Sequence, residues 1–554
     1  MSISIANHGI QTNKTNETEN MIQTKPKHSS TEPLILAIIS FFSSLIIGYV
    51  LVFKYNIIYV DAWTRALEPL YTVFHPGFHL AAMGFVWNPL PSLLMLPFAI
   101  ARNIWPPLMR VGFAANILSS LFAGVAVYHL NRIYRRFNII QPFRILWSLL
   151  YLTTPMILLY SSNGMTDGMA CATFIACLDG VIAYFNNKSI ISIVRASIWL
   201  AAAFMIRYEA VPVGALLGLG VFLTIYINER NWKKAQAIAI MLWFLVVSAG
   251  LIWMLLNWMI MKNPLYFLTS NYGNSSQISS GTYNNQFMLA ASHHLPVAIS
   301  EVIRFSILFW PFYPVLALVV IIEIFQRKKS FGWPIILASL GSPILQIALL
   351  YLHKSADWSR FFIYYIPFGF ILMGYAVSKI IQFQALRKVN YIIFSVFSLL
   401  IISAFPIDLQ AIQNKNWGHG DTGFTLKLLT GNGHNGGESS QPYLIPGIQV
   451  ANYINSHPQD KVLLSTFHMF GAVPYLKNPN QVVLTNDTDY KSVLDNPRGR
   501  VNLILVESPQ NVNAKTDTLV STYPTMWYGG VSWTKLVHQF SNGDRMFEVL
   551  STAP

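Results

Sequence analysis

The sequence predicts a polytopic α-helical membrane protein with about eleven spans, interfacial helices in its first outer loop, and a small C-terminal extracytoplasmic α/β domain. Hydrophobic residues make up 53% of the 554 residues and charged residues only 11%, against about 25% charged in soluble proteins. Apolar runs of about 20 residues, long enough to cross the hydrocarbon core, recur up to residue 408. Short strand-like runs separated by turn residues replace them in the last quarter of the chain.

The membrane part, residues 33–408, follows a tail (1–32) that is rich in Asn, Thr, Ser and Lys and is predicted to be disordered. The first apolar run lacks a small-residue cleavage site, so we expect a retained anchor. We place spans near 34–53, 108–130, 143–161, 166–185, 191–206, 209–227, 236–260, 299–325, 333–352, 361–380 and 390–408.

The distribution of positive charge predicts the orientation of these spans. Residues 1–408 contain 27 basic and 13 acidic residues, whereas 409–554 contain ten of each. With the N-terminus in the cytoplasm, 18 of the 27 basic residues fall in cytoplasmic segments, which is the asymmetry that the positive-inside rule describes. Eleven spans then put the C-terminal domain outside the cytoplasm. No basic stripe forms, which excludes nucleic-acid binding.

The segment 88–107 is apolar but is predicted to lie along the outer interface instead of crossing the membrane. As a span, it would move the arginine cluster at 132–136 to the outside. It also holds five prolines, which disfavour a straight helix: Pro89, Pro91, Pro97, Pro106 and Pro107. We therefore expect an amphipathic or re-entrant element there.

The C-terminal part divides into a Gly/Asn-rich linker, 409–444, and an α/β domain, 445–554. The run IPGIQVANYINSH predicts a helix. The runs VLLST, QVVLT, VNLILVES and RMFEVL, with turn residues between them, predict short strands.

Ionisable residues at the predicted outer ends of the spans are the candidate site, because charge at membrane depth is costly and therefore often functional. They come from separate spans yet face the same side of the membrane: Asp61, Arg65, Asp167, Arg207, Glu209, Asp357 and Arg360. A structural role stays open for several of them. Asp167 can cap a helix, and Arg207 and Arg360 can extend to lipid head groups beside a paired acid.

Acids and arginines at this depth suit one class of chemistry. A carboxylate can take the proton of an attacking hydroxyl, and arginine can hold a phosphate bidentately. A lipid-phosphate donor in the outer leaflet presents its head group at the same depth. The sequence therefore predicts group transfer from a lipid-linked phosphate to a hydroxyl.

The same segments resemble the C-type glycosyltransferase superfamily, in particular the dolichyl-phosphate-mannose protein mannosyltransferases and the aminoarabinose transferases. The pieces that carry the resemblance span about 34–400 and are VDAWTRA, GFVWNPLPSLLMLPF, TDGMACATFIACLDGVIAYF, WLAAAFMIRYEAVPVGALLGLGVFL and SRFFIYYIPFG. The chain departs from many relatives at Ala62, where they have a second acid, at Asn88, where they have Lys, and at Pro91, to which the second proline is displaced.

The resemblance implies an inverting sugar transfer from a polyprenyl- or dolichyl-phosphate donor to a protein, lipid or glycan acceptor. Asp61 would be the general base, and Asp167 would orient the acceptor or support a second proton contact. Because Asn88 replaces the lysine, the donor phosphate would fall to Arg207, Arg360 or Arg65, with support from Glu209, Asp357 and Asn88. A divalent metal is left open.

Two other functions stay open from the sequence. A transporter or flippase of lipid-linked sugars would have paired inverted halves and charges near the bilayer midplane. A non-enzymatic envelope scaffold would use the outer domain to bind a partner and would not need the acids.

Overall fold

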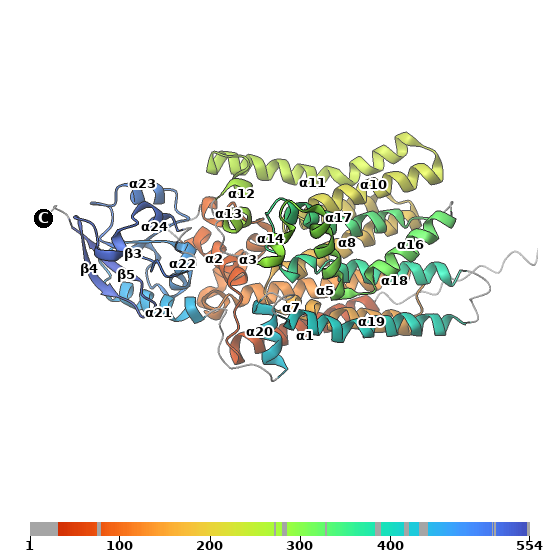
Figure 1. Cartoon of the computed structure of the whole chain (residues 1–554), viewed down its shortest axis with the longest axis horizontal. Coiled ribbons are helices and arrows are strands. Elements are labelled where there is room, and N and C mark those ends of the chain that lie inside the picture. Colours follow the sequence, from red (N-terminus) through yellow and green to blue (C-terminus); the bar gives the residue numbers. More distant parts are fainter. Residues whose placement is uncertain are drawn as a thin grey trace, which may run out of the picture.

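The structure, a computed structural model, describes residues 31–74, 79–270, 273–279, 285–326, 330–382, 389–414, 420–430, 441–511, 514 and 517–550. The predicted tail, 1–32, lies outside the described residues except for Thr31 and Glu32, which already belong to the first helix. A bundle of long helices carries a small α/β domain at one end (Figure 1).

The predicted spans coincide with apolar helices. Within the described residues, eight helices are long and apolar enough to cross a membrane, or ten if two bent pairs count as one span each. Helix α9 is shorter, at 15 residues. The membrane helices are α1 (Thr31–Tyr49, continued by the π-turn η1, Val50–Lys54), α5 (Phe113–Arg136), α6 (Gln141–Thr153), α7 (Pro155–Ser162), α8 (Thr166–Asn187), α9 (Ile190–Phe204), α10 (Ala210–Glu229), α11 (Trp232–Met261), α15 (Leu295–Arg304), η4 (Phe305–Phe309), α16 (Phe312–Gln326), α17 (Trp333–Tyr351), η5 (Ser359–Phe362), α18 (Tyr365–Ile380) and α19 (Asn390–Gln413).

Two predicted spans are broken instead of straight. The spans expected at 143–161 and 299–325 are the pairs α6–α7, bent by 66°, and α15–α16, bent by 96°. Pro155 begins α7 and Pro311 precedes α16. Proline lacks the N–H that continues a helical hydrogen-bond ladder, and its ring clashes with the preceding turn, which accounts for both breaks.

Burial divides the bundle into central and peripheral helices. In the most apolar stretch of each helix, all residues of η5–α18 and 94% of those of α8 are buried, whereas only 22% of those of α11 are. Apolar side chains on α11 and α19, such as Phe244, Leu251 and Leu399, are exposed. In water these surfaces would be costly, so the protein is an integral membrane protein whose outer helices face lipid.

Short helices lie in the segments that connect the membrane helices to one another and to the C-terminal domain, and the first of them carries the predicted Asp61. They are α2 (Val60–Phe74), η2 (Leu80–Met83), α3 (Leu90–Ile100), η3 (Ala101–Asn103), α4 (Pro107–Arg110), α12 (Tyr266–Thr269), α13 (Asn274–Ser279), α14 (Gln286–Ala291) and α20 (Gly420–Leu429). The segment 88–107 is thus a set of short helices. Helix α20 lies inside the predicted linker.

The second span begins at Phe113 and not near 108 as predicted. Gly112 has φ +65° there, and a Cβ on it would lie 2.9 Å from the Cα of Trp63. Glycine tolerates this left-handed conformation and lets α2 approach closely.

The C-terminal domain is a five-stranded sheet in the order β2-β1-β3-β5-β4, in which β1, β2 and β3 are parallel and β5 and β4 antiparallel. Its elements are α21 (Gln441–Ser456), β1 (Val462–Leu464), α22 (Thr466–Met469), η7 (Phe470–Tyr475), η8 (Pro479–Gln481), β2 (Val482–Leu484), α23 (Tyr490–Asp495), β3 (Leu503–Val506), α24 (Thr518–Thr522), α25 (Met526–Gly529), β4 (Thr534–Gln539) and β5 (Arg545–Val549). The four predicted strands are present. Strand β4 was not predicted, because it is exposed and carries little apolar alternation.

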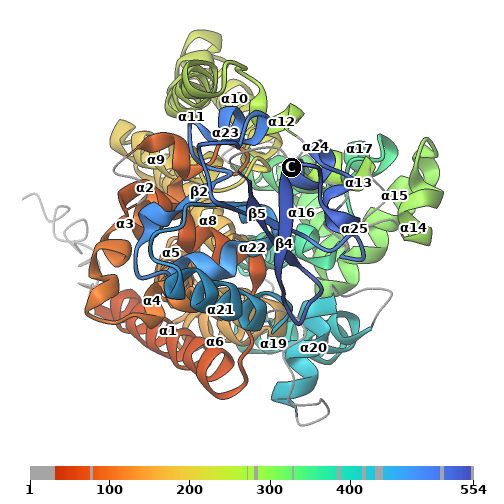
Figure 2. The same cartoon turned by 90° about the vertical axis from the view of Figure 1, so that its left-hand side faces the viewer.

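The domain contacts the outer helices through both apolar and polar groups. The rings of Trp63 on α2 and Phe470 on η7 meet edge to face, with centroids 5.2 Å apart. Asn486 Nδ2 donates to the carbonyl of Ala82 at 3.3 Å. Figure 2, seen from the domain end, shows the sheet in front of the helices.

The opposite end of the bundle holds much of the basic charge. Glu32 at the start of α1 accepts from Arg144 Nη2 at 2.6 Å and from Asn131 Nδ2 at 3.0 Å. Asp179 on α8 pairs with Arg136 at 2.8 Å and with Arg132 at 3.2 Å. These contacts bring the ends of α1, α5, α6 and α8 to one face of the bundle.

Candidate active site

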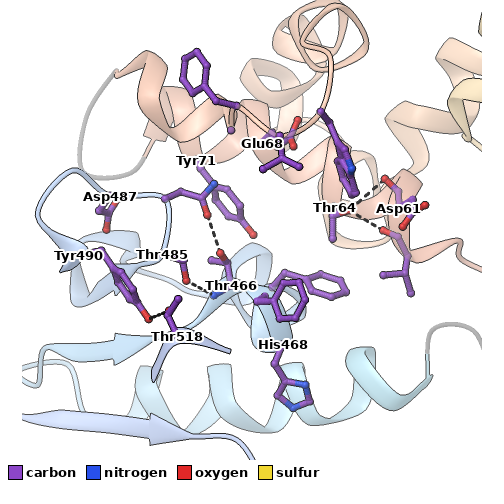
Figure 3. Close-up of a pocket in the computed structure, with 18 of the residues that line it drawn as sticks. Asp61, Thr64, Glu68, Tyr71, Thr466, His468, Thr485, Asp487, Tyr490 and Thr518 are labelled. Carbon is purple, nitrogen blue, oxygen red and sulfur yellow. Dashed lines mark hydrogen bonds between the residues drawn. The ribbon is translucent and has the colours of Figure 1, made fainter. Parts of the chain in front are cut away.

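A cavity of about 1280 Å³ lies between the bundle and the C-terminal domain. Helix α2 and the connection from η2 to α3 line one side, and loops of the domain line the other. In Figure 3, Asp61, Thr64, Glu68 and Tyr71 of α2 lie across the cavity from Thr466, Thr485 and Tyr490 of the domain.

Asp61 lies in the first turn of α2 and lines the cavity. The helix N-terminus favours a negative charge there. Asp61 Oδ2 accepts from Arg360 Nη1 at 2.8 Å, and its side chain is 39% exposed. The carboxylate is therefore both held by a cation and open to a substrate.

Arg360 comes from η5, nearly 300 residues away along the chain, and also lines the cavity. Its guanidinium stacks over the ring of Trp358, with its central carbon 4.5 Å from the ring centroid. Its side chain is 8% exposed. Stacking and the Asp61 carboxylate compensate for the loss of water around this charge.

Asp167, at the start of α8, belongs to a second ion cluster. It is completely buried, and its Oδ1 accepts from Arg207 Nη1 at 2.8 Å. Arg207 Nη2 also donates to Glu209 at 2.6 Å. Burial raises the pKa of Glu209, but the Arg207 guanidinium outweighs it and holds the pKa below its ordinary value. None of the three is among the described residues that line the cavity.

Arg65 and Asn88 fix the loop before α3. The Arg65 guanidinium stacks over Trp87 at 4.6 Å, and its Nη1 donates to the Asn88 carbonyl at 3.1 Å. Asn88 Nδ2 donates to the Phe204 carbonyl at 2.5 Å, at the end of α9. Trp87 lines the cavity, whereas Arg65 and Asn88 are buried behind the described lining residues.

Asp357 is buried in a third cluster, apart from the described cavity lining. It pairs with Arg304 Nη2 at 3.5 Å, and Arg304 pairs with Glu301 at 2.6 Å. Burial raises the pKa of Asp357 to about 7, and Arg304 offsets only part of the rise.

Glu68 lines the cavity although it is not among the predicted site residues. It lies seven positions after Asp61, on the same face of α2, and accepts a hydrogen bond from the Ser92 hydroxyl. Burial raises the pKa of Glu68 to about 7, and Arg65 lowers it only in part. The sequence places Asp61, Arg65 and Glu68 at i, i+4 and i+7, on one face of a predicted short helix, but no role in the reaction was predicted for Glu68.

The domain side of the cavity was also missed. Thr466, Thr485, Asn486, Asp487 and Glu507, here called the C-terminal wall, all line it. Each follows closely on the carboxyl end of β1, β2 or β3. The predicted strands and the polar residues after them contained this signal, because the carboxyl ends of parallel strands meet at one edge of a sheet.

In the described parts of the chain, no group of three or more His, Cys, Asp or Glu side chains has an arrangement that could hold a metal ion.

Neither a family model nor a curated protein sequence matches the chain. Among solved structures, ArnT from Cupriavidus metallidurans bound to undecaprenyl phosphate is similar, with a TM-score of 0.53 and 12% identity over 94% of this chain and 98% of that chain. The Archaeoglobus fulgidus oligosaccharyltransferase in the apo form has a TM-score of 0.47 and 12% identity, over 86% of this chain and 70% of that one. The archaeal oligosaccharyltransferase AglB from the same organism, in complex with an inhibitory peptide and a dolichol-phosphate, has a TM-score of 0.45 and 11% identity, over 85% of this chain and 69% of that chain.

The likeness to ArnT extends over nearly the whole of both chains. It shows that the two chains share a fold, which agrees with the predicted resemblance, and it confirms the predicted architecture of membrane helices followed by a small domain.

Proposed function

We propose that this protein is a membrane glycosyltransferase that moves a sugar from a polyprenyl-phosphate donor to an acceptor hydroxyl in the cavity beneath the C-terminal domain. The observation that carries the proposal is the Asp61–Arg360 pair at 2.8 Å, which puts a partly exposed carboxylate and a buried cation on the wall of one large cavity. The fold shared with ArnT, which was solved with undecaprenyl phosphate, supports the donor class.

In the proposed reaction, the acceptor oxygen attacks the anomeric carbon while the bond from that carbon to the phosphate oxygen breaks. Asp61 takes the acceptor's proton. Polyprenyl phosphate leaves with the bonding electrons, and Arg360 stabilises the negative charge that grows on it. Attack from the face opposite the phosphate inverts the anomeric centre.

The ion pair itself couples donor binding to base strength. A carboxylate beside a guanidinium is a weak base, because the positive charge stabilises its ionised form. A donor phosphate that engages Arg360 competes with Asp61 for this charge. We infer that donor binding strengthens Asp61 as a base when the acceptor must lose its proton.

The other predicted residues take supporting roles in this proposal. Asp167 and Glu209 both pair with Arg207, and this buried cluster positions the start of α8 and the turn before α10. Arg65 and Asn88 hold the loop that presents Trp87 to the cavity. Among the described residues that line the cavity, Arg360 is the single arginine, so it is the proposed phosphate ligand.

We propose that the cavity opens on the extracytoplasmic side. The basic residues Arg132, Arg136 and Arg144 gather at the other end of the bundle, and such residues favour the cytoplasmic side. The N-terminus would then be cytoplasmic.

The test is transfer of radiolabelled sugar by the purified full chain in lipid nanodiscs, from a panel of polyprenyl-phosphate sugars to a membrane extract that supplies acceptors. Labelled product that depends on donor and protein supports the proposal. Absence of product from every donor, together with movement of labelled lipid between leaflets in proteoliposomes, contradicts it and favours a flippase.

A further inference from the structure

We propose that the C-terminal wall is the acceptor-binding site, and that the acceptor it takes is a carbohydrate that is uncharged or carries amino groups, not a phosphorylated group. This inference rests on the proposed function for its chemistry, because it names the acceptor of the same cavity. Its test is a binding experiment that requires no transfer.

The topology of the domain places the residues of the C-terminal wall at the cavity that Asp61 lines. Strands β1, β2 and β3 are parallel, and Thr466, Asn486 and Glu507 come directly or almost directly after their carboxyl ends. Ligands of open α/β sheets bind outside this edge. Here the edge lines the same cavity as Asp61, so a ligand held by the wall lies within one enclosure with the proposed base.

The polar groups of the wall are already held in position. Thr466 Oγ1 donates to Asn486 Oδ1 at 2.7 Å, and the Thr466 backbone N–H donates to Thr485 Oγ1 at 3.0 Å. These hydroxyl and amide groups can both donate and accept hydrogen bonds, as a ring of sugar hydroxyls requires. Figure 3 shows them on the loops that face α2.

A buried carboxylate provides the second, independent indication of a ligand. Glu507 is only 4% exposed and yet lines the cavity. Its Oε1 lies 3.0 Å from His468 Nδ1, and its Oε2 has no hydrogen-bond partner in the described parts of the chain. A buried carboxylate oxygen that lacks a donor is costly, and a hydroxyl or ammonium group of a ligand would satisfy it.

The charge of this side of the cavity disfavours a phosphorylated acceptor. Its described lining includes the acids Asp487, Asp495 and Glu507 and the cations Lys491 and His468. His468 is already shared by two carboxylates, since its Nε2 also lies 3.0 Å from Asp544, and Lys491 pairs with Asp495 at 3.7 Å. A phosphate would meet this excess of negative charge, whereas hydroxyl and amino groups would be stabilised by it.

Aromatic rings supply the apolar faces on which sugar rings can lie. Tyr443, Phe467, Phe470 and Tyr490 line the same side of the cavity. Such rings combine a large apolar face with polar neighbours, the usual composition of a small-ligand site.

An extended peptide fits the wall less well. Peptides that bind to sheets add a strand along an exposed edge, using the backbone of the edge strand. The edge strands of this sheet are β2 and β4. The cavity faces the ends of the strands, where a peptide cannot pair with the backbone N–H and C=O groups along an edge strand.

The test uses the full chain in nanodiscs on an array of immobilised neutral, amino-bearing and phosphorylated oligosaccharides and Ser/Thr-rich peptides. The variant is Thr488→Arg, an exposed cavity-lining position beside the wall. The matched control is Thr525→Arg, which is exposed in the same domain and is not among the described lining residues. We expect binding to neutral or amino-bearing glycans, about tenfold weaker in Thr488→Arg and unchanged in Thr525→Arg.

Three results would overturn the inference: binding to phosphorylated glycans or peptides alone, binding to none of the glycans, or equal binding by Thr488→Arg and the wild type. Glycan binding without sugar transfer would support acceptor binding by the C-terminal wall and contradict the proposed transferase activity. Sugar transfer without glycan binding would support the transferase activity and contradict acceptor binding by the C-terminal wall.

Discussion

The two carboxylate–arginine pairs at the domain end of the bundle have the same ion-pair distance but opposite surroundings. Asp61–Arg360 and Asp167–Arg207 each join an Oδ to an Nη1 at 2.8 Å. Asp61 is 39% exposed on the cavity wall, whereas Asp167 is completely buried and shares its arginine with Glu209.

This contrast separates chemistry from scaffolding. A carboxylate must reach the acceptor's hydroxyl to act as its base, and Asp61 meets that requirement. A buried ion cluster with several partners fixes the position of the segments that carry it, and removing one member weakens the contacts between those segments. Mutations in the first pair should therefore mainly lower the transfer rate per folded molecule, and mutations in the second should mainly lower stability.

The largest expected effect is that of Asp61→Asn on the rate of transfer. The amide keeps the size of the side chain but cannot take a proton, so single-turnover transfer should fall by about 10²- to 10⁴-fold. The melting temperature should also fall, because the buried Arg360 guanidinium loses its carboxylate partner, so the transfer rate is compared per folded molecule. Undiminished transfer would move the base to another group, with Glu68, which also lines the cavity, as the next candidate.

Arg360→Lys should have the next largest effect. Lysine keeps the charge but loses the planar fork that binds phosphate bidentately and the stacking on Trp358. We expect about 10- to 100-fold weaker donor use, measured as the KM for the polyprenyl-phosphate sugar. Arg195→Lys, at an exposed position on α9, is the control and should leave this KM unchanged.

Asp167→Asn should act on stability more than on chemistry. Arg207 keeps Glu209 as its partner, so the loss is that of a charge-assisted hydrogen bond inside the bundle, about 1.5–3 kcal/mol, and the melting temperature in nanodiscs should drop. The transfer rate per folded molecule should fall less than in Asp61→Asn. A variant that melts like the wild type but transfers nothing would instead assign Asp167 a direct role.

The smallest effect concerns the C-terminal domain and pH. Burial lowers the pKa of His468, but Asp544 and Glu507 outweigh it and raise the pKa to about 10, against about 6.5 in the unfolded chain. Protonated His468 therefore stabilises the folded domain. This contribution to the free energy of unfolding is complete below about pH 6.5 and is lost as the pH rises through about 10. The melting temperature of the wild type should fall toward that of His468→Asn over this range. A constant difference between the two would contradict the assignment of charge to His468.

Much of the fold could be predicted from the sequence, because lipid imposes a simple rule on length and polarity. Apolar runs located the membrane helices, and the prolines of 88–107 explain why that apolar segment forms short helices instead of one long helix. The bends at Pro155 and Pro311 were not foreseen, since a hydropathy pattern does not distinguish a straight span from a broken one of the same length.

The candidate site was harder to predict, because pairing depends on tertiary contacts. The sequence made Arg207 and Arg360 the candidate phosphate ligands and Arg65 a weaker one. In the structure, Arg360 reaches the cavity, whereas Arg207 pairs with two acids and Arg65 stacks on Trp87. The C-terminal wall was missed for the same reason. Its residues become a site only when the domain docks on α2.

The most direct test of the central claim is chemical rescue of transfer by formate in Asp61→Ala and Asp167→Ala, compared side by side. Formate can replace a lost carboxylate where the position is open to solvent. We predict that formate restores transfer to Asp61→Ala, at the cavity wall, and not to Asp167→Ala, which is sealed inside the bundle. Rescue of Asp167→Ala alone, or of neither variant, would contradict the assignment of Asp61 as the base.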